Sequence, residues 1–415
     1  MHARLLFDRT SVTMSAFMAA LLVIAAATTS SAQPSMNASV GGSFEGFQDG
    51  QATSERRQNV NGAVGFEHLF AGERGRVFYD FDGGTYDSPG DWSYNLHRLG
   101  VAYRLGGSGD TDRRFFVNGT FVGRRNGDAW ANADYRALGA SANAEFHPGD
   151  GLTLRSGYRI DHRVFADLTD LTQTEHQVFG SLLANLPSRT TLIGEVHVGT
   201  KRYEGQVVTD YISTEVPVSG GVYGRGHGTG MVASVYTATT VVTPVLESQN
   251  GNAGLVYGLV RVAQSLADRT GVHAQASVRS TFGAVPPGLV TTPAGFFDDG
   301  VYDDPYASDA TAAQAGFTHA FASGADLSGQ VLWTDKRYTS TPALDATGAT
   351  QPGSPLRHDE VWRGGIVWSQ PVFAARTGRA TLTIDVGYRF TNSQSNDAFY
   401  RYTSHGMGLG FSIGY

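Results

Sequence analysis

Residues 272–282 read VHAQASVRSTF, and the spacing of their side chains decides the fold. Small or apolar side chains stand at every second position from Val272 to Phe282, and polar side chains such as Gln275 and Arg279 stand between them. A period of two residues is that of a β-strand with one apolar and one polar face. The same alternation runs through residues 138–146 and 380–390. The chain is therefore predicted to be all-β.

The connections between such segments distinguish two all-β architectures. A soluble β-sandwich shows the same alternation, because it also buries one face of each strand. In this chain, short connections such as 147–150 and 267–271 alternate with long ones at 205–252, 283–309 and 339–357. Short turns at one end and long loops at the other are typical of transmembrane β-barrels.

The alternation of turns and loops predicts a single antiparallel transmembrane β-barrel of about sixteen strands within residues 33–415. An even number of strands brings both chain ends to one side, so the segments 205–252, 283–309 and 339–357 become extracellular loops. Residues 232–245 are β-rich enough to add one further hairpin, which would bring the number to about eighteen. The predicted strands are residues 36–48, 58–70, 76–86, 92–106, 113–125, 135–146, 152–165, 174–186, 190–204, 253–266, 272–282, 310–321, 327–338, 358–370, 379–392 and 399–415.

The first 32 residues have the composition of a secretory signal peptide that is cleaved on export. Arg4 and Arg9 precede an apolar run at 14–27, which small residues follow up to Ala32. This run is shorter than the roughly 20 apolar residues that a transmembrane helix needs, and no longer run follows it. The chain has no cysteine, which excludes disulfides, thiolate metal sites and a cysteine-linked lipid anchor. A membrane role must therefore rest on strands.

The end of the chain carries a family resemblance. Its last residues, LGFSIGY, form an alternating apolar row that closes on an aromatic side chain. The row resembles the C-terminal assembly signal of bacterial outer-membrane β-barrels such as porins: Gly410, Ile413 and Tyr415 match it, and Phe411 belongs to the same row. Leu409 departs from the pattern, because a polar residue usually precedes the glycine. The resemblance implies location in the outer membrane, contact with its lipid and recognition by the barrel assembly machinery, but it identifies no subfamily.

Charged residues on the polar strand faces would line the interior of such a barrel, where selectivity is set. The densest set lies on one predicted strand, because Arg155, Arg159, Asp161 and Arg163 share a face. It indicates either a basic ladder that favours anions or sugar acids, or charges that merely pair across neighbouring strands. The predicted inner residues are basic at Arg98, Arg104, Arg124, Arg155, Arg159, Arg163, Lys201, Arg261, Arg279, Arg363 and Arg389, and acidic at Asp80, Asp82, Glu145, Asp161, Glu175, Glu195 and Asp385.

Other kinds of chemistry find less support in the sequence. Acidic loop residues such as Asp304 and Asp309 carry calcium-type oxygen ligands but lack EF-hand spacing, so no metal site is predicted. His162, His176 and His405 have no serine at the spacing that a nucleophile needs, so neither an enzyme nor a cofactor is predicted. The formal net charge of −7 argues against a nucleic-acid partner, which needs a basic surface.

The function predicted from the sequence is a porin-like channel for passive or weakly selective diffusion of small hydrophilic solutes. The alternative is an export outlet or an anchoring scaffold for a surface polysaccharide or protein complex. An open lumen would favour the channel, whereas a lumen closed by its own side chains would favour the scaffold. The number of subunits stays open, because the sequence shows no distinct interface on the lipid side.

Overall fold

The computed structural model describes residues 35–49, 54–71, 74–87, 93–106, 113–219, 236–285, 304–374 and 380–414. The predicted signal peptide, residues 1–32, and Tyr415 of the predicted assembly signal lie outside this part. The strands are β1 (Ser35–Asp49), β2 (Ser54–Phe70), β3 (Gly75–Asp87), β4 (Tyr94–Leu105), β5 (Arg113–Asn126), β6 (Tyr135–Gly149), β7 (Leu152–Phe165), β8 (Gln173–Leu186), β9 (Thr190–Ser219), β10 (Tyr236–Ala267), β11 (Thr270–Ala284), β12 (Ser308–Ala320), β13 (Asp326–Pro342), β14 (Leu356–Ala374), β15 (Thr381–Ser395) and β16 (Tyr402–Gly414).

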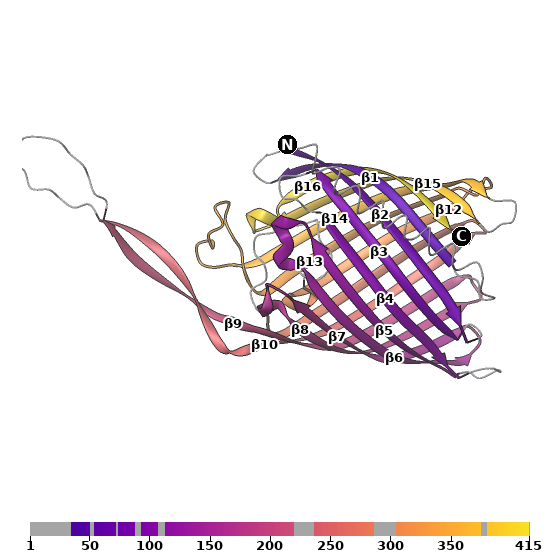
Figure 1. Ribbon diagram of the computed structural model, residues 1–415, viewed down its shortest axis with the longest axis horizontal. Coiled ribbons are helices and arrows are strands. Elements are labelled where there is room, and N and C mark those ends of the chain that lie inside the picture. The colour runs from indigo at the N-terminus through magenta and orange to yellow at the C-terminus, as the bar shows by residue number, and fades with distance from the viewer. Residues whose placement is uncertain are drawn as a thin grey trace, which may run out of the picture.

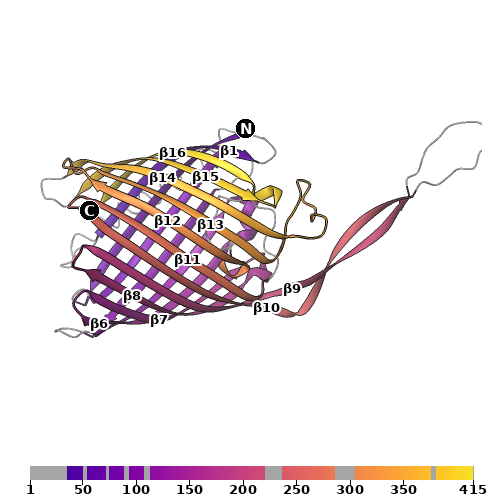
Figure 2. The ribbon, with the colours of Figure 1, turned by 180° about the vertical axis from the view of Figure 1, so that it is seen from behind.

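These strands form one closed antiparallel barrel (Figure 1, Figure 2). Each strand pairs with its neighbours in the chain, and β1 closes the ring against β16, with Gly41 opposite Gly410. A closed ring has no free edge, so the backbone groups of every strand find partners within the sheet, as a membrane requires. The predicted all-β fold and the predicted sixteen strands are confirmed.

The two ends of the barrel differ in their connections. The end that holds the start of β1 and the end of β16, here the turn end, has short turns such as residues 150–151 between β6 and β7. Gly151 has a φ of +75°, and a Cβ there would lie 2.5 Å from the Asn185 carbonyl oxygen, so this turn requires glycine. In the described part of the chain, the opposite end, here the loop end, carries four short 3-10 helices: η1 (Asp128–Ala133), η2 (Thr169–Leu171), η3 (Pro305–Ala307) and η4 (Ala398–Tyr400).

The loop predicted at residues 205–252 is wrong for most of its length. β9 continues to Ser219 and β10 begins at Tyr236, and together they form a hairpin that projects from the loop end (Figure 1). β-Branched and tyrosine side chains are frequent in these residues and favour strands. The hairpin lengthens two existing strands instead of adding a pair, so the number of strands stays at sixteen and does not reach eighteen. Residues 220–235 lie outside the described part.

The outer wall of the barrel is apolar. Leu99, Leu138, Val178, Val278 and Met407, from five different strands, have exposed fractions between 51% and 63%. Water would solvate such a surface poorly, whereas the hydrocarbon of a membrane matches it, so the wall faces lipid. Within the described residues, no helix is long and apolar enough to span a bilayer.

Candidate functional site

The charged residues predicted to lie inside the barrel are on its inner wall. Successive side chains of a strand point to opposite faces of the sheet. The exposed apolar side chains mark the outer face, so the side chains between them point into the lumen. On β7, for example, Leu154, Tyr158 and Val164 are exposed, so the odd-numbered residues between them face the lumen. The same alternation places on the inner wall Asp80, Asp82, Arg98, Arg104, Arg124, Glu145, Arg155, Arg159, Asp161, Arg163, Glu175, Glu195, Lys201, Arg261, Arg279, Arg363, Asp385 and Arg389. Their contact with a solute stays a prediction.

Part of this inner charge is paired across neighbouring strands. Arg155 of β7 lies 2.8 Å from Glu145 of β6, and Arg159 lies 3.4 Å from Glu175 of β8. Two strands further along the ring, Arg98 of β4 lies 3.9 Å from a carboxylate oxygen of β3. Pairing of this kind is the second of the two alternatives for the β7 charges, and it breaks up a continuous basic ladder.

Two other inner arginines lie over aromatic rings near the loop end. The Arg124 guanidinium is 4.9 Å from the centre of the Tyr94 ring, and that of Arg163 is 4.5 Å from the centre of the Tyr135 ring. Arg124 Nε also donates to Asn126 Oδ1 at 2.8 Å. Contacts with rings and amides orient a guanidinium, so both groups are held in fixed positions on the inner wall.

A turn between β11 and β12, residues 304–308, is fastened to the inner wall, and we call it the inner turn. Lys201 Nζ of β9 donates to both carboxylate oxygens of Asp304 at 3.0 Å, and the Tyr203 hydroxyl donates to one of them at 2.5 Å. The Lys201 side chain is only 4% exposed. A buried ammonium group requires a countercharge, and Asp304 supplies it.

Packing adds to this ionic attachment of the inner turn. Tyr306 is 3% exposed and lies on Gly199 of β9, where a Cβ would be 2.3 Å from the tyrosine hydroxyl oxygen. Burial raises the pKa of Tyr306 far above its ordinary range, so its hydroxyl stays protonated. Arg279 of β11 holds the end of the turn by donating to the Ser308 carbonyl oxygen at 3.0 Å and to its hydroxyl at 2.7 Å.

Five inner arginines have no carboxylate within ion-pair distance in the described part of the chain: Arg104, Arg261, Arg279, Arg363 and Arg389. Arg363 and Arg389 lie close together, because Arg389 of β15 pairs in register with Gly365 of β14, two residues from Arg363. Such diagonal positions on one face have Cβ atoms about 7–8 Å apart. The inner wall of β14 and β15 thus carries these two arginines outside any ion pair and the carboxylate of Asp385, which is an excess of positive charge among the described residues.

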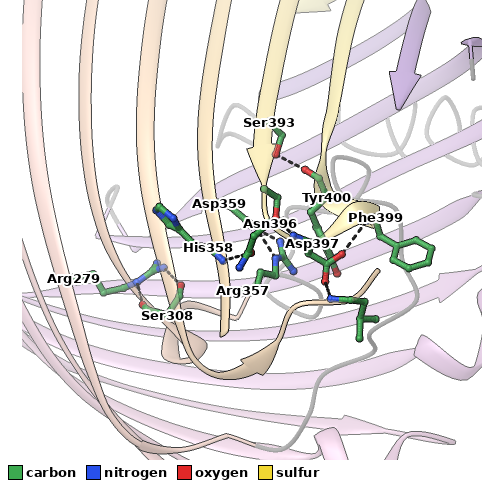
Figure 3. Close-up of polar contacts among 12 residues, drawn as sticks. Arg279, Ser308, Arg357, His358, Asp359, Ser393, Asn396, Asp397, Phe399 and Tyr400 are labelled. Carbon is green, nitrogen blue, oxygen red and sulfur yellow. Dashed lines mark hydrogen bonds and ion pairs between the residues drawn. The ribbon is translucent and has the colours of Figure 1, made fainter. Parts of the chain in front are cut away.

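A second polar cluster, the rim network, lies at the loop end of β13–β16 (Figure 3). Arg357 and Asp359 of β14 form a two-contact ion pair, with Nε 3.0 Å from Oδ1 and both residues less than 10% exposed. Ser395 of β15 donates to the same carboxylate at 2.7 Å, and the Arg357 guanidinium lies 4.3 Å from the centre of the Tyr338 ring. Every member is satisfied within the protein, which is typical of a cluster that holds structure.

Asp397 connects two loops within this network. It is 1% exposed, and its carboxylate accepts the backbone amides of Leu344 at 3.0 Å and Phe399 at 2.9 Å (Figure 3). The β13–β14 loop is thereby fixed to η4. Burial raises the pKa of Tyr400 in η4. The rim network thus keeps the loop end over β13–β16 in one arrangement.

Sequence reasoning missed the inner turn and the rim network. The sequence shows Asp304 only as one of several acidic loop residues, and nothing near it in the chain points to Lys201. Among the described residues, no group of three or more histidines and carboxylates is arranged to hold a metal ion.

The three histidines considered for catalysis lie on the outer wall. Tyr158 and Tyr388 hydrogen-bond to Nδ1 of His176 and His405 at 2.5 and 2.7 Å, and the His162 ring is 2.9 Å from a threonine hydroxyl. In the described part of the chain, no hydrogen bond joins any of the three to a serine. Hydrogen bonding to a neighbouring strand satisfies a polar ring that faces lipid.

Comparison with known proteins gives no relative by sequence. No family model matches the chain, and no curated protein matches it. Solved structures that resemble it include Pseudomonas aeruginosa OccK2 (OpdF) in complex with glucuronate (9% identity, TM-score 0.47) and Acinetobacter baumannii OccAB1 (8% identity, TM-score 0.47). The outer membrane protein OprD from Pseudomonas aeruginosa is a third (9% identity, TM-score 0.43). Each similarity covers 92% of this chain, and the matched regions are 96%, 96% and 94% of those chains.

Sequence identities and TM-scores this low say nothing of the solute or the activity of this protein. Its structural class is therefore assigned from its own geometry. That geometry is a closed ring of strands with an apolar outer wall and a charged inner wall. The chain is a sixteen-stranded transmembrane β-barrel.

Proposed function

We propose that the protein is an outer-membrane channel for diffusion of small hydrophilic solutes, with a weak preference for anions. The observation that carries the preference is the pair Arg363 and Arg389, which lie on adjacent inner strands without a carboxylate in ion-pair distance among the described residues. Fixed charge on the wall of a pore attracts counter-ions and sets its selectivity. Pairing of Arg155 and Arg159 with carboxylates keeps that preference weak.

The inner turn contributes to the proposal as a fixed element on the lumen side of β9–β11. Its attachment through Lys201, Tyr203 and Arg279 leaves it no freedom to leave the wall without exposing a buried ion pair. A rigid element on the wall restricts solutes by size, whereas the arginines act on their charge. Both properties are those of a passive filter.

Ion permeation through single molecules tests this function. The purified chain is inserted into a planar bilayer under a potassium chloride gradient, and the reversal potential gives the ratio of chloride to potassium permeability. Discrete conductance steps with a ratio above one are expected. In the double variant Arg363→Gln/Arg389→Gln the ratio should fall by about two-fold, because these two positive charges are gone.

A matched control removes two positive charges from the outer face of the barrel wall instead of the inner face. Arg113→Gln/Arg337→Gln changes two outward-facing arginines and should leave the permeability ratio unchanged. A folded barrel that inserts but never conducts would overturn the channel function. Equal effects of the inner and outer double variants would overturn the role given to Arg363 and Arg389.

A further inference from the structure

Two arginines at the loop end of β5 and β6 face outward rather than into the lumen. Arg125 shares the outer face of β5 with Phe121, and Arg136 shares that of β6 with Leu138, two apolar residues with exposed fractions of 42% and 61%. Both arginines are exposed, and neither has an ion pair or hydrogen bond with another described residue. A positive charge here therefore faces the surroundings of the barrel.

The register brings the two guanidinium groups together. Arg136 pairs with Gly123, two residues from Arg125, so the two arginines are diagonal neighbours on one face. Diagonal Cβ atoms lie about 7–8 Å apart, a span that two arginine side chains close around one anionic group. The strands on either side add no carboxylate at this level, since Arg125 pairs with Asn95 of β4 and Arg136 pairs with Val164 of β7.

The surface just below the pair is apolar. Phe121 and Leu138 are themselves opposite each other in register, directly on the turn-end side of Gly123 and Arg136. From the middle of the barrel to the loop end, the outer face of β5–β6 thus changes from apolar residues to two cations. A lipid has the same order of parts, with acyl chains in the interior and a charged headgroup at the surface.

Two other arginines on the outer wall lack this arrangement. Arg113, at the turn end of β5, lies over the Phe146 ring at 5.6 Å. Arg337, at the loop end of β13, has its Nε 3.3 Å from Asp335 Oδ1. Each already has a partner within the protein.

Arg202, at the loop end of β9, is exposed and outward-facing like Arg125 and Arg136, but its register partners are Thr174 and Asn252, so it has no second cation beside it. Among the described residues, Arg125 and Arg136 are therefore the adjacent pair of outward cations that are free to bind an external anion.

We propose that Arg125 and Arg136 form a binding site for the phosphate of an anionic lipid in the leaflet at the loop end. Guanidinium groups bind phosphate through paired, charge-assisted hydrogen bonds, and the Phe121–Leu138 pair would contact the first part of the acyl chains. The inference rests on the proposed placement in an outer membrane, whose outward leaflet is at the loop end. It does not depend on conduction.

Binding of lipid A to the whole barrel in detergent tests the site, with affinity measured by native mass spectrometry. Arg125→Gln/Arg136→Gln should weaken binding by about ten-fold or more, because two charge-assisted contacts are lost. The matched control Arg113→Gln/Arg337→Gln also removes two outward arginines and should keep the affinity of the unchanged protein. Equal affinities of all three proteins, or equal losses in both variants, would overturn the site.

Further measurements identify the ligand. Lipid A stripped of its phosphates should bind the unchanged protein as weakly as lipid A binds the Arg125→Gln/Arg136→Gln variant. Soluble glucosamine phosphate should compete poorly, and competition as strong as that of lipid A would show a free phosphate site instead of a lipid site. If the double variant does not fold, lipid A affinity of the unchanged protein should still fall between about 50 mM and about 500 mM salt, and a constant affinity would contradict the proposal.

Single-channel conductance of the same preparations separates the two proposals. A barrel that conducts but shows no dependence on lipid phosphate would overturn only the lipid site. A barrel that binds lipid A through these arginines but does not conduct would overturn only the channel function.

Discussion

Val278 and Arg279 are adjacent on β11, but one side chain faces lipid and the other faces the lumen. Val278 is 60% exposed on the outer wall, whereas Arg279 faces inward and donates to Ser308. A charge that faces lipid costs roughly 2–4 kcal/mol near the middle of the membrane. A charge that faces the lumen has water or polar partners. A charged side chain is therefore tolerated at position 279 but not at position 278.

The variant Val278→Arg is therefore expected to block assembly, with a loss of about 2–4 kcal/mol in the free energy of folding. Arg279→Ala loses its two hydrogen bonds to Ser308 and loosens the inner turn, but it should still give a closed barrel. The fraction of protein that migrates as a heat-modifiable band on a gel measures both. Equal folding yields would show that the facing of β11 is wrong.

Asp345 gives the β13–β14 loop a dependence on pH. Its carboxylate accepts the Thr347 hydroxyl at 2.7 Å and the backbone amides of Thr347 and Ala349 at 2.8 and 3.1 Å. The Thr347 side chain, then the Thr347 amide, lower the pKa of Asp345 below that of the unfolded chain. A carboxyl group with a lowered pKa stabilises the fold above its unfolded pKa and loses that contribution as the pH falls through the folded value.

The turn at residues 345–349 should therefore be protected at neutral pH and should lose that protection only as the pH falls below the ordinary aspartate pKa of about 3.9. Hydrogen exchange of the Thr347 amide, expressed as a protection factor, checks this. In Asp345→Asn the protection should be weaker and independent of pH between these limits, because an amide oxygen accepts the same bonds without a charge. A protection factor in the unchanged protein that stays constant down to about pH 2 would contradict the assignment.

Among the elements, the inner turn is held by one buried ion pair, between Lys201 and Asp304, beside its hydrogen bonds and packing. Removing one partner of such a pair leaves an uncompensated charge and costs about 3–5 kcal/mol. Asp304→Asn keeps an oxygen that accepts the Tyr306 amide but takes the countercharge from Lys201. The turn should detach, seen as faster hydrogen exchange at Ala307 and as noisier single-channel current. Asp309→Asn, which removes a carboxylate without an ion-pair partner in the described residues, is the control and should have a smaller effect.

The strands could be predicted from sequence because each carries its own alternation, and the predicted range 152–165 is the range of β7. The inner turn could not, because Lys201 and Asp304 are 103 positions apart and neither has a local pattern. The rim network likewise joins Leu344 to Asp397 across 53 positions. The projecting hairpin could be predicted only in part: residues 232–245 are β-rich in the sequence, but they predict an added hairpin that would bring the number of strands to eighteen. The structure places them in an extension of β9 and β10, because alternation alone does not show whether a β-rich segment continues an existing strand or starts a new one.

At the scale of the whole molecule, the closed ring and the projecting hairpin are separate structural units. β9 pairs with β8 only up to Tyr203, and β10 pairs with β11 only from Asn252 onward. Residues between these limits pair with each other alone in the described part of the chain. The ring, by contrast, needs every strand, because the loss of one leaves two unpaired edges in contact with lipid.

Deleting residues 206–250 should therefore leave the barrel intact, although it removes more residues than β16 contains. The deletion joins Gly205 to Gly251, and a glycine pair suits a tight turn between antiparallel strands. Deleting residues 402–414 should instead prevent closure, because β1 and β15 both lose their partner. Heat-modifiable migration and the thermal unfolding midpoint compare the two. A hairpin deletion that fails to fold would show that the projecting strands help to close the ring, because folding would then depend on residues that pair with no other strand of the barrel.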